Sequence, residues 1–156
     1  MIMADKGIPD NFLSRLADIT GSSLFFEVKK TFVERPTTFR VNGIKTLEHK
    51  NISAQGGSAL GGKTILENQG FKLRQVSWYK DAFILLNKSK RELTETDVYK
   101  NGQIYIQSLS SMMPPLVLDP QPGERVLDLC AAPGSKTSQI AALMNREGEL
   151  VANDVN

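Results

Sequence analysis

The feature that most constrains the fold is a pair of short apolar segments on either side of a helical pattern. Residues 125–130 (RVLDLC) are typical of a short buried strand, and 149–154 (ELVAND) of a second strand. Between them, 135–145 (SKTSQIAALMN) has helical spacing, with Ile140 and Leu143 on the inner side. A strand, a crossover helix and a second strand predict the opening of a parallel α/β sheet.

The loop between the first strand and the helix has the properties of a ligand-binding turn. Gly134 lets the backbone approach a ligand closely, and Ser135 can cap the helix. Asp154 lies 20 residues beyond Gly134, where nucleotide-binding sheets place an acid that binds ribose hydroxyls. Residues 130–133 (CAAP) replace the early glycines of G-x-G-x-x-G, which makes a dinucleotide a less suitable ligand. A purely structural turn is the alternative.

A second glycine-rich stretch, GGSALGGKT (56–64), also matches a nucleotide motif. From Gly57 it satisfies G-x-x-x-x-G-K-[ST], which would make the chain a nucleotide hydrolase. A phosphate loop needs a buried strand before it, and the preceding LEHKNISAQ supplies none. We interpret residues 48–64 as a flexible loop, followed by a short helix TILENQ.

The first hundred residues mix helices and strands without βαβ alternation, which predicts a small α+β domain. A helix is expected from an N-cap at Asp10 to Gly21, and a second helix from there to Pro36. Strands are predicted at 37–42, 71–79 and 81–87, the last two as a hairpin around Lys80.

The segment that joins this part to the parallel sheet, 105–118, contains serines ahead of Met112 that can cap a helix. Its pair Pro114–Pro115 is expected in a first helical turn rather than deep inside the helix.

The net charge of +2 is unevenly distributed. Residues 1–100 contain sixteen Lys and Arg against eleven Asp and Glu, whereas 101–156 contain three against six. The range 63–91 contains seven basic and two acidic residues, with Trp78 and Tyr79 among them. Basic and aromatic side chains together suit a surface that binds RNA phosphates and stacks on bases, although an ordinary solvated face is the alternative.

Several classes of protein are excluded by what the sequence lacks. With only Cys130 and His49, the chain can form neither an internal disulfide framework nor a zinc cluster. No apolar run is long enough to span a membrane, and the opening MIMADKGIPD has no secretory signal pattern. We therefore expect a cytoplasmic protein that involves no membrane and no metal.

The stretch YIQSLSSMMPPLVLDPQPGERVLDLCAAPGSKT (105–137), with RPTTFRVN upstream and LVAND downstream, resembles the Sun/NOP-type RNA cytosine-5 methyltransferases. That family includes the bacterial Rsm-type ribosomal RNA enzymes. The resemblance covers roughly 35–156, and D-L-C-A-A-P-G-x-K-T is a specific signature, although the family more often has glycine at the position of Ser135. It implies a methyltransferase that acts on rRNA or tRNA, with S-adenosyl-L-methionine as cofactor and a Rossmann-like class I fold.

The resemblance also implies roles for particular residues. The loop would bind the cofactor and Asp154 its ribose; the expected cofactor-binding residues are Cys130, Ala131, Ala132, Pro133, Gly134, Ser135, Lys136 and Asp154. Residues 1–100 would bind RNA; the candidate contacts are Arg40, Lys72, Arg74, Lys80, Lys88, Lys90 and Arg91.

Cytosine-5 methylation requires a cysteine thiolate, and this chain has none in the expected context. The family carries two cysteines in Asp-Ala-Pro-Cys and Thr-Cys-Ser motifs, neither of which occurs here. Cys130 matches a non-catalytic family position, where a small buried side chain is expected. We therefore expect the catalytic cysteines to lie beyond Asn156.

The sequence thus predicts the first part of a longer enzyme that is inactive by itself. Residues 1–100 would form the RNA-binding domain, and 101–156 would begin a methyltransferase domain with its first βαβ unit. Two parallel strands with open edges would favour self-association. The alternative is a non-catalytic RNA-binding module that retains a remnant of the cofactor loop.

Overall fold

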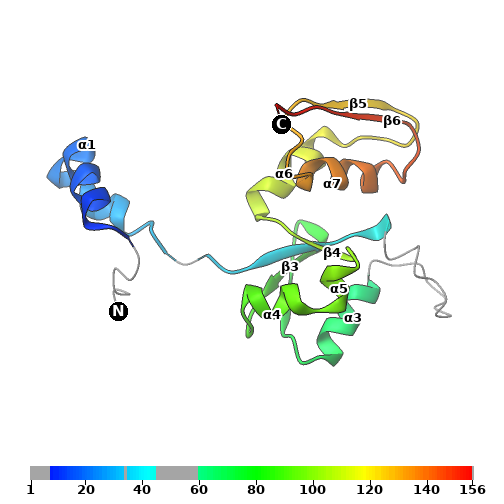
Figure 1. Cartoon of the computed structure of the whole chain (residues 1–156), viewed down its shortest axis with the longest axis horizontal. Coiled ribbons are helices and arrows are strands. Elements are labelled where there is room, and N and C mark those ends of the chain that lie inside the picture. Colours follow the sequence, from blue (N-terminus) through cyan, green and yellow to red (C-terminus); the bar gives the residue numbers. More distant parts are fainter. Residues whose placement is uncertain (1–7, 34, 45–59, 156) are drawn as a thin grey trace. The chain divides into compact units, whose positions relative to one another are not determined.

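The computed structural model describes residues 8–33, 35–44 and 60–155. Contacts divide the chain into two units, Met1–Arg35 and Pro36–Asn156. Figure 1 traces the elements of both units along the chain.

The first unit contains helix α1 (Asp10–Lys29), which is interrupted at Gly21. Gly21 has φ 69° and ψ 163°, so two helical segments meet there, as the sequence predicts. The N-cap is Pro9 rather than Asp10; Asp10 is the first helical residue, where a negative charge favours the helix N-terminus. No residue of α1 is buried in the described structure, and Ile19 is 75% exposed.

The second unit begins with a four-stranded antiparallel sheet in the order β2–β3–β1–β4. The strands are β1 (Thr38–Val41), β2 (Leu73–Val76), β3 (Tyr79–Leu85) and β4 (Ile104–Ile106). The predicted strands are confirmed, but the hairpin turns at residues 77–78, so Lys80 is a strand residue and not part of the turn. Because β4 pairs with β1, the sheet extends beyond residue 100, where the sequence predicts the first domain to end.

One face of this sheet is covered by helices α3 (Leu60–Asn68), α4 (Lys90–Glu95) and α5 (Asp97–Lys100). Ser89 and Glu92 form a capping box that satisfies the first amides of α4. Strands and helices bury a common apolar core: Phe39, Val41, Leu66, Phe71, Phe83, Leu85, Leu93, Val98 and Ile104. This core, rather than the propensity of four- to nine-residue helices, holds the three helices in place.

Helix α3 corrects the prediction of a flexible loop as far as Thr64, because the helix already begins at Leu60. Residues 56–59 lie outside the described residues. A Cβ at Gly62 would lie 3.4 Å from Cγ1 of Val98, an ordinary van der Waals distance, so this position faces the core. Lys63 Nζ lies 3.1 Å from Glu67 Oε2, one helical turn away. The glycine–lysine pair therefore lies within a helix that packs on the core.

The opposite face of the sheet packs against helix α6 (Leu109–Leu118), whose Met112 is fully buried. The Ser108 hydroxyl caps this helix by accepting from the Ser111 amide, which confirms the predicted serine cap.

Pro114 and Pro115 lie inside α6, beyond the first turn in which the sequence predicts them. Neither proline has an N–H group, so the carbonyls of Ser110 and Ser111 lose their helical donors. The Ser111 carbonyl instead accepts from Nε2 of Gln107 at 3.0 Å. A side chain thus replaces one of the missing backbone donors, and the helix continues.

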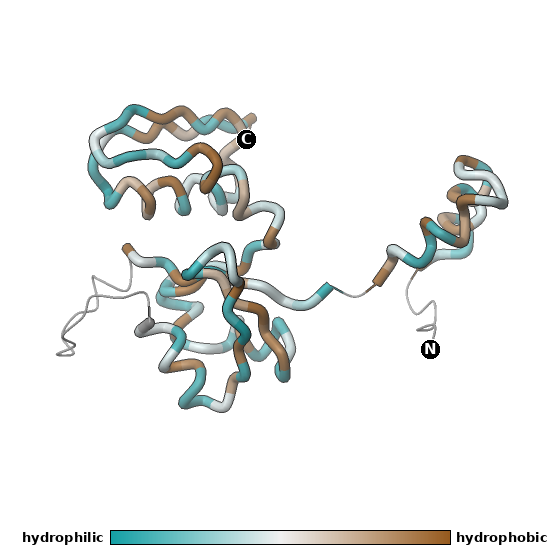
Figure 2. The backbone as a smooth tube through the Cα atoms, turned by 180° about the vertical axis from the view of Figure 1, so that it is seen from behind, coloured by the Kyte–Doolittle hydropathy of each residue, from teal (hydrophilic) through white to brown (hydrophobic). Residues whose placement is uncertain are grey.

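The C-terminal part is the predicted βαβ arrangement: β5 (Arg125–Asp128), α7 (Ser135–Leu143) and β6 (Glu149–Ala152), with β5 and β6 parallel. Ile140 and Met144 are buried, so α7 packs its apolar side inward. The prediction of a buried β5 is wrong, because its residues are exposed or half-buried and Leu127 is 58% exposed. In β6, Val151 is 47% exposed. Apolar residues are adjacent in both strands, at 126–127 in β5 and at 150–152 in β6 (Figure 2).

None of the helices in the described ranges combines the length and the apolar character needed to cross a membrane. Nor does any group of three or more His, Cys, Asp or Glu in these ranges come together as metal ligands.

The turn into β6 depends on Gly148, which has φ 114°. A Cβ at this position would lie 2.3 Å from the Glu124 carbonyl oxygen, much closer than a carbon can approach. We expect Gly148→Ala to lower the free energy of unfolding by about 2 kcal/mol or more, measured by chemical denaturation.

The matched control is Gly123→Ala, since Gly123 has φ 90° but a Cβ there would meet nothing within 4 Å. This variant bears the backbone strain without the clash and should lose less stability. Equal losses in the two variants would contradict the role of close packing at Gly148.

Candidate functional site

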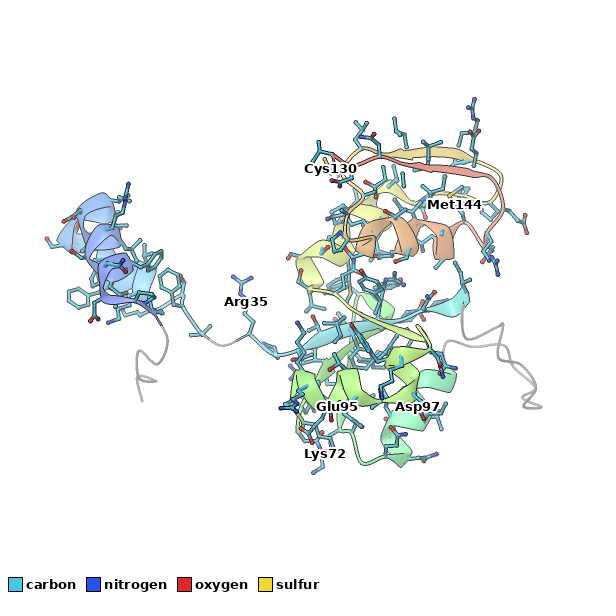
Figure 3. All side chains as sticks on the ribbon, in the orientation of Figure 1. Arg35, Lys72, Glu95, Asp97, Cys130 and Met144 are labelled. Carbon is cyan, nitrogen blue, oxygen red and sulfur yellow. The ribbon has the colours of Figure 1, made fainter. Side chains whose placement is uncertain are left out.

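The predicted binding loop connects the end of β5 to the start of α7, at the edge where the carboxyl ends of both parallel strands lie. Figure 3 labels Cys130 in this loop and Met144 just past the far end of α7. Sheets of this kind bind ligands at this edge because the strands deliver their following loops to one place.

Asp128, the last residue of β5, ties the loop to the helix that follows it. One carboxylate oxygen accepts from the Cys130 amide at 3.2 Å, and the other accepts from the Thr137 hydroxyl at 2.7 Å. Because both contacts involve a charged acceptor, they are stronger than bonds between neutral groups. The carboxylate therefore fixes the distance between the end of the strand and the first turn of α7.

Asp154, which follows β6, contacts the same loop from the other strand. Its Oδ2 accepts from the Ala132 amide at 2.8 Å, and its Oδ1 accepts from the Val155 amide at 2.8 Å. The Ala131 amide also donates to the Asn153 carbonyl at 3.0 Å. The structure thus brings the loop and Asp154 together, as the sequence predicts.

Gly134 is the N-cap of α7 and has φ 94°, which explains why glycine suits this position. A Cβ there would meet no atom within 4 Å, so the space beside the loop is open. Ser135 is the first helical residue and not the predicted cap. Within the described part of the chain, the amides of residues 135–137 donate no hydrogen bond. They lie at the positive end of the helix dipole, where an anion is favoured.

Arg40 of β1 contacts the N-terminal part of α7 and is fully buried. Its Nη2 donates to the Ser138 hydroxyl at 2.6 Å and to the Ser135 carbonyl at 3.3 Å. Its Nε donates to Oε1 of Gln107 at 2.9 Å. The guanidinium also lies over the Tyr105 ring, 5.4 Å from the centroid. These contacts join the antiparallel sheet to the first turn of α7.

Tyr105 and two glutamines extend this buried connection. The Tyr105 hydroxyl donates to the Pro133 carbonyl of the loop at 3.0 Å. The Gln107 amide donates to Oε1 of Gln139 at 2.9 Å, and Gln139 donates in turn to the Met112 carbonyl at 2.9 Å. The loop, α6 and α7 are therefore held by side chains from a sheet that precedes them in the sequence.

Burial dominates the electrostatics around Arg40. It lowers the pKa of the Arg40 guanidinium, against the opposing influence of Tyr79, Tyr105 and Asp81. Burial likewise raises the pKa of Tyr79 and of the Asp81 carboxyl. An arginine nevertheless stays protonated at any physiological pH, so a positive charge resides beneath the start of α7.

Two of the predicted site residues differ from expectation. Cys130 is exposed and not buried, because the loop emerges past the end of β5 where α7 does not cover it. The prediction that Arg40 contacts RNA at the surface is wrong, because its guanidinium is buried against α7.

The other basic candidates lie on the surface of the second unit. Lys72, Arg74, Lys80, Lys90 and Arg91 are exposed. Lys88 instead lies over the Phe71 ring at 4.1 Å and donates to the Gln69 carbonyl at 2.9 Å, while Arg91 pairs with Glu95 at 3.1 Å. Trp78, 46% exposed, lies at the turn of the β2–β3 hairpin and stacks on Tyr79.

Sequence reasoning did not single out Asp128, Thr137, Tyr105 or Gln107. Asp128 and Thr137 open and close the signature DLCAAPGSKT, so that motif carried a signal for both. Nothing local marked the contacts of Tyr105 with the loop or of Gln107 with Gln139, which span 28 and 32 positions in the sequence.

Comparison with known proteins finds similarity to RNA methyltransferases. Residues 115–156 match a family model described as 16S rRNA methyltransferase RsmB/F. The chain is 33% identical over 157 residues to the 26S rRNA (cytosine-C(5))-methyltransferase nsun-1 of Caenorhabditis elegans, covering 99% of the chain and 22% of that protein. It is 39% identical over 152 residues to the ribosomal RNA small subunit methyltransferase F of Vibrio vulnificus, covering 94% of the chain and 30% of that protein.

A solved structure has the same fold over nearly the whole chain. The methyltransferase homolog protein from Pyrococcus horikoshii superposes with a TM-score of 0.69 at 35% identity, covering 96% of this chain and 45% of that one. The chain thus spans less than half of this structural relative, and about a fifth to a third of the two curated relatives.

The contact between Thr137 and Asp128 makes a testable contribution to stability. Thr137→Val keeps the shape of the side chain but leaves the half-buried carboxylate without one donor, so we expect a loss of about 1–3 kcal/mol in the free energy of unfolding. Chemical denaturation measures it. Thr94→Val is the control, because Thr94 bonds only to the nearby Arg91 carbonyl. A loss no greater than that of the control would contradict the role of Asp128.

Proposed function

We propose that the chain forms part of an S-adenosylmethionine-dependent RNA (cytosine-5) methyltransferase, because residues 115–156 match the RsmB/F family model and nearly the whole chain is similar to rRNA methyltransferases. In this proposal the chain supplies one side of the cofactor site and a surface that binds ribosomal or transfer RNA. The observation that carries it is the meeting of the loop Cys130–Lys136 with the Asp154 carboxylate at the carboxyl ends of two parallel strands.

The residues of this edge suit the chemistry of S-adenosylmethionine. Its amino-acid end carries a carboxylate. The amides of residues 135–137, which donate no hydrogen bond in the described structure, lie at the positive end of α7 and favour an anion. Gly134 leaves open space beside the loop. This end of the cofactor would therefore lie against the start of α7.

Asp154 would hold the ribose. A carboxylate has about four acceptor sites, and the Ala132 and Val155 amides use two of them. The remaining sites can accept from two ribose hydroxyls. The Ala132 contact also keeps the carboxylate beside the loop, so that both ends of the cofactor are held at a set distance.

When bound, the cofactor supplies a methyl group on a positively charged sulfur. The residues of this chain would bind and orient it; we assign them no part in activating the cytosine. That step requires a cysteine thiolate, and Cys130 lies in the loop that would contact the cofactor. Its position in the signature also corresponds to a non-catalytic cysteine of the family.

RNA would bind to the β2–β3 hairpin of the antiparallel sheet. Lys72, Arg74 and Lys80 expose their charges there, and the Trp78 ring lies at the turn. Basic side chains contact phosphates without regard to sequence, and an exposed indole can stack on an unpaired base.

The cofactor proposal is tested by Asp154→Asn in the full-length gene product. The amide keeps an acceptor for Ala132 but loses the charge that strengthens bonds to ribose hydroxyls, so we expect S-adenosylmethionine to bind about tenfold or more weakly. Calorimetry measures the affinity. Asp119→Asn is the control, because Asp119 is an exposed cap at the end of α6. Unchanged affinity of Asp154→Asn would argue against the assignment.

The RNA proposal is tested by the salt dependence of binding. Replacing Lys72, Arg74 or Lys80 by Gln should reduce the slope of log affinity against log salt by about 0.7–0.9 for each phosphate that the variant no longer neutralises. Filter binding or fluorescence anisotropy with ribosomal RNA fragments measures it. Lys100→Gln, on α5, is the control. Slopes that match the unsubstituted protein in all three variants would place RNA binding elsewhere.

A further inference from the structure

Arg40 is a buried positive charge whose hydrogen-bond acceptors are all neutral. It is 0% exposed, and it bonds to a glutamine amide, a serine hydroxyl and a backbone carbonyl. In the described part of the chain, it has no carboxylate within ion-pair distance, and its Nη1 has no hydrogen-bond partner. Asp81 acts on it only as a more distant charge.

Such an arrangement costs stability. An ion taken out of water is normally paired, and an apolar side chain of similar volume often serves stability as well or better. The Tyr105 ring offsets part of the cost through a cation–π contact at 5.4 Å. The remaining cost needs a reason other than packing.

The position of the charge supplies that reason. Nη2 contacts Ser135 and Ser138, which places the guanidinium within one turn of the amides of residues 135–137. The helix dipole is positive at the same end, so the two fields add. A positive potential of this kind stabilises an anion at the start of α7 and disfavours a cation there.

We propose that Arg40 is a positioning residue for the carboxylate of the methyl donor, on which it acts through the first turn of α7 without touching it. The inference rests on the proposed function, which places the amino-acid end of the cofactor at this turn. Arg40 adds positive potential, and its bond to the Ser135 carbonyl sets the orientation of the Ser135–Lys136 peptide plane and hence of the Lys136 amide.

A variant at Tyr105 separates the effect of the Arg40 charge from the effect of the position of the loop. Its hydroxyl holds the Pro133 carbonyl on the same side of the loop but carries no charge. Removing this hydroxyl should therefore disturb the position of the loop while leaving the potential at α7 unchanged.

The experiment compares two ligands on the full-length gene product by calorimetry. S-adenosylhomocysteine has the carboxylate; its decarboxylated analogue keeps the amine and lacks only that group. We expect Arg40→Gln to lower the affinity for S-adenosylhomocysteine by roughly tenfold. The affinity for the decarboxylated ligand should fall much less, because only the carboxylate ligand loses a charge–charge attraction. Arg125→Gln is the control, since Arg125 lies exposed at the opposite end of β5.

Two further variants keep the test decisive if Arg40→Gln does not fold. Arg40→Lys retains the charge and should keep most of the preference for the carboxylate ligand. Tyr105→Phe should lower the affinities for both ligands by similar factors and leave the preference for the carboxylate ligand unchanged.

The inference would be overturned if Arg40→Gln lowered the affinities for both ligands equally. It would also be overturned if Arg40→Lys or Tyr105→Phe lost the preference for the carboxylate ligand. These outcomes differ from failure of the proposed function, in which the unsubstituted protein binds neither ligand.

Discussion

The burial of the Arg40 guanidinium is the interaction on which the rest of the second unit depends. A strand of the antiparallel sheet carries the charge, while its acceptors come from α7 and from the segment after β4. A buried charge without these acceptors would cost several kcal/mol, so Arg40 can be buried only where the sheet and α7 pack together. This contact links the two sheets that residues 36–156 contain.

The same network resolves a conflict within α6. The prolines at 114 and 115 remove two backbone donors from a helix that has to cover the sheet with Met112. Gln107 donates to the Ser111 carbonyl, and Gln139 binds both Gln107 and the Met112 carbonyl. Gln107 therefore bonds both to the proline-containing helix and to the buried arginine, while Gln139 bonds to Gln107 and to the same helix. Because these side chains bond to one another, replacement of any one leaves another group unpaired.

The loop itself is held by a different principle, namely carboxylates that accept backbone amides. Asp128 ends β5 and Asp154 follows the adjacent parallel strand β6, and each accepts from an amide of the loop between β5 and α7. Such bonds set the shape of the loop from its own sequence neighbourhood. The antiparallel sheet then sets its orientation through Arg40 and Tyr105, so the proposed site combines a locally determined loop with a distant support.

The sequence by itself determined the elements whose signals are local. The βαβ unit, the break at Gly21, the serine cap at Ser108 and the meeting of the loop with Asp154 follow from periodicity, turn residues and the order of strands. The sequence did not determine where the hairpin turns, where α3 begins or how far into α6 the two prolines lie. In α3 the contacts with the core, and in α6 the donor from the Gln107 side chain, outweigh the propensity of the residues concerned.

Only the tertiary structure decided the roles of individual charged side chains. From its residue type, Arg40 is as suitable for RNA as Arg74, yet one is buried beneath α7 and the other is exposed. The difference lies in partners far away in the chain, since Arg40 reaches Ser138 across 98 positions. A linear pattern records which groups are present but not which of them meet, because the free energy that buries a charge comes from contacts that exist only after folding.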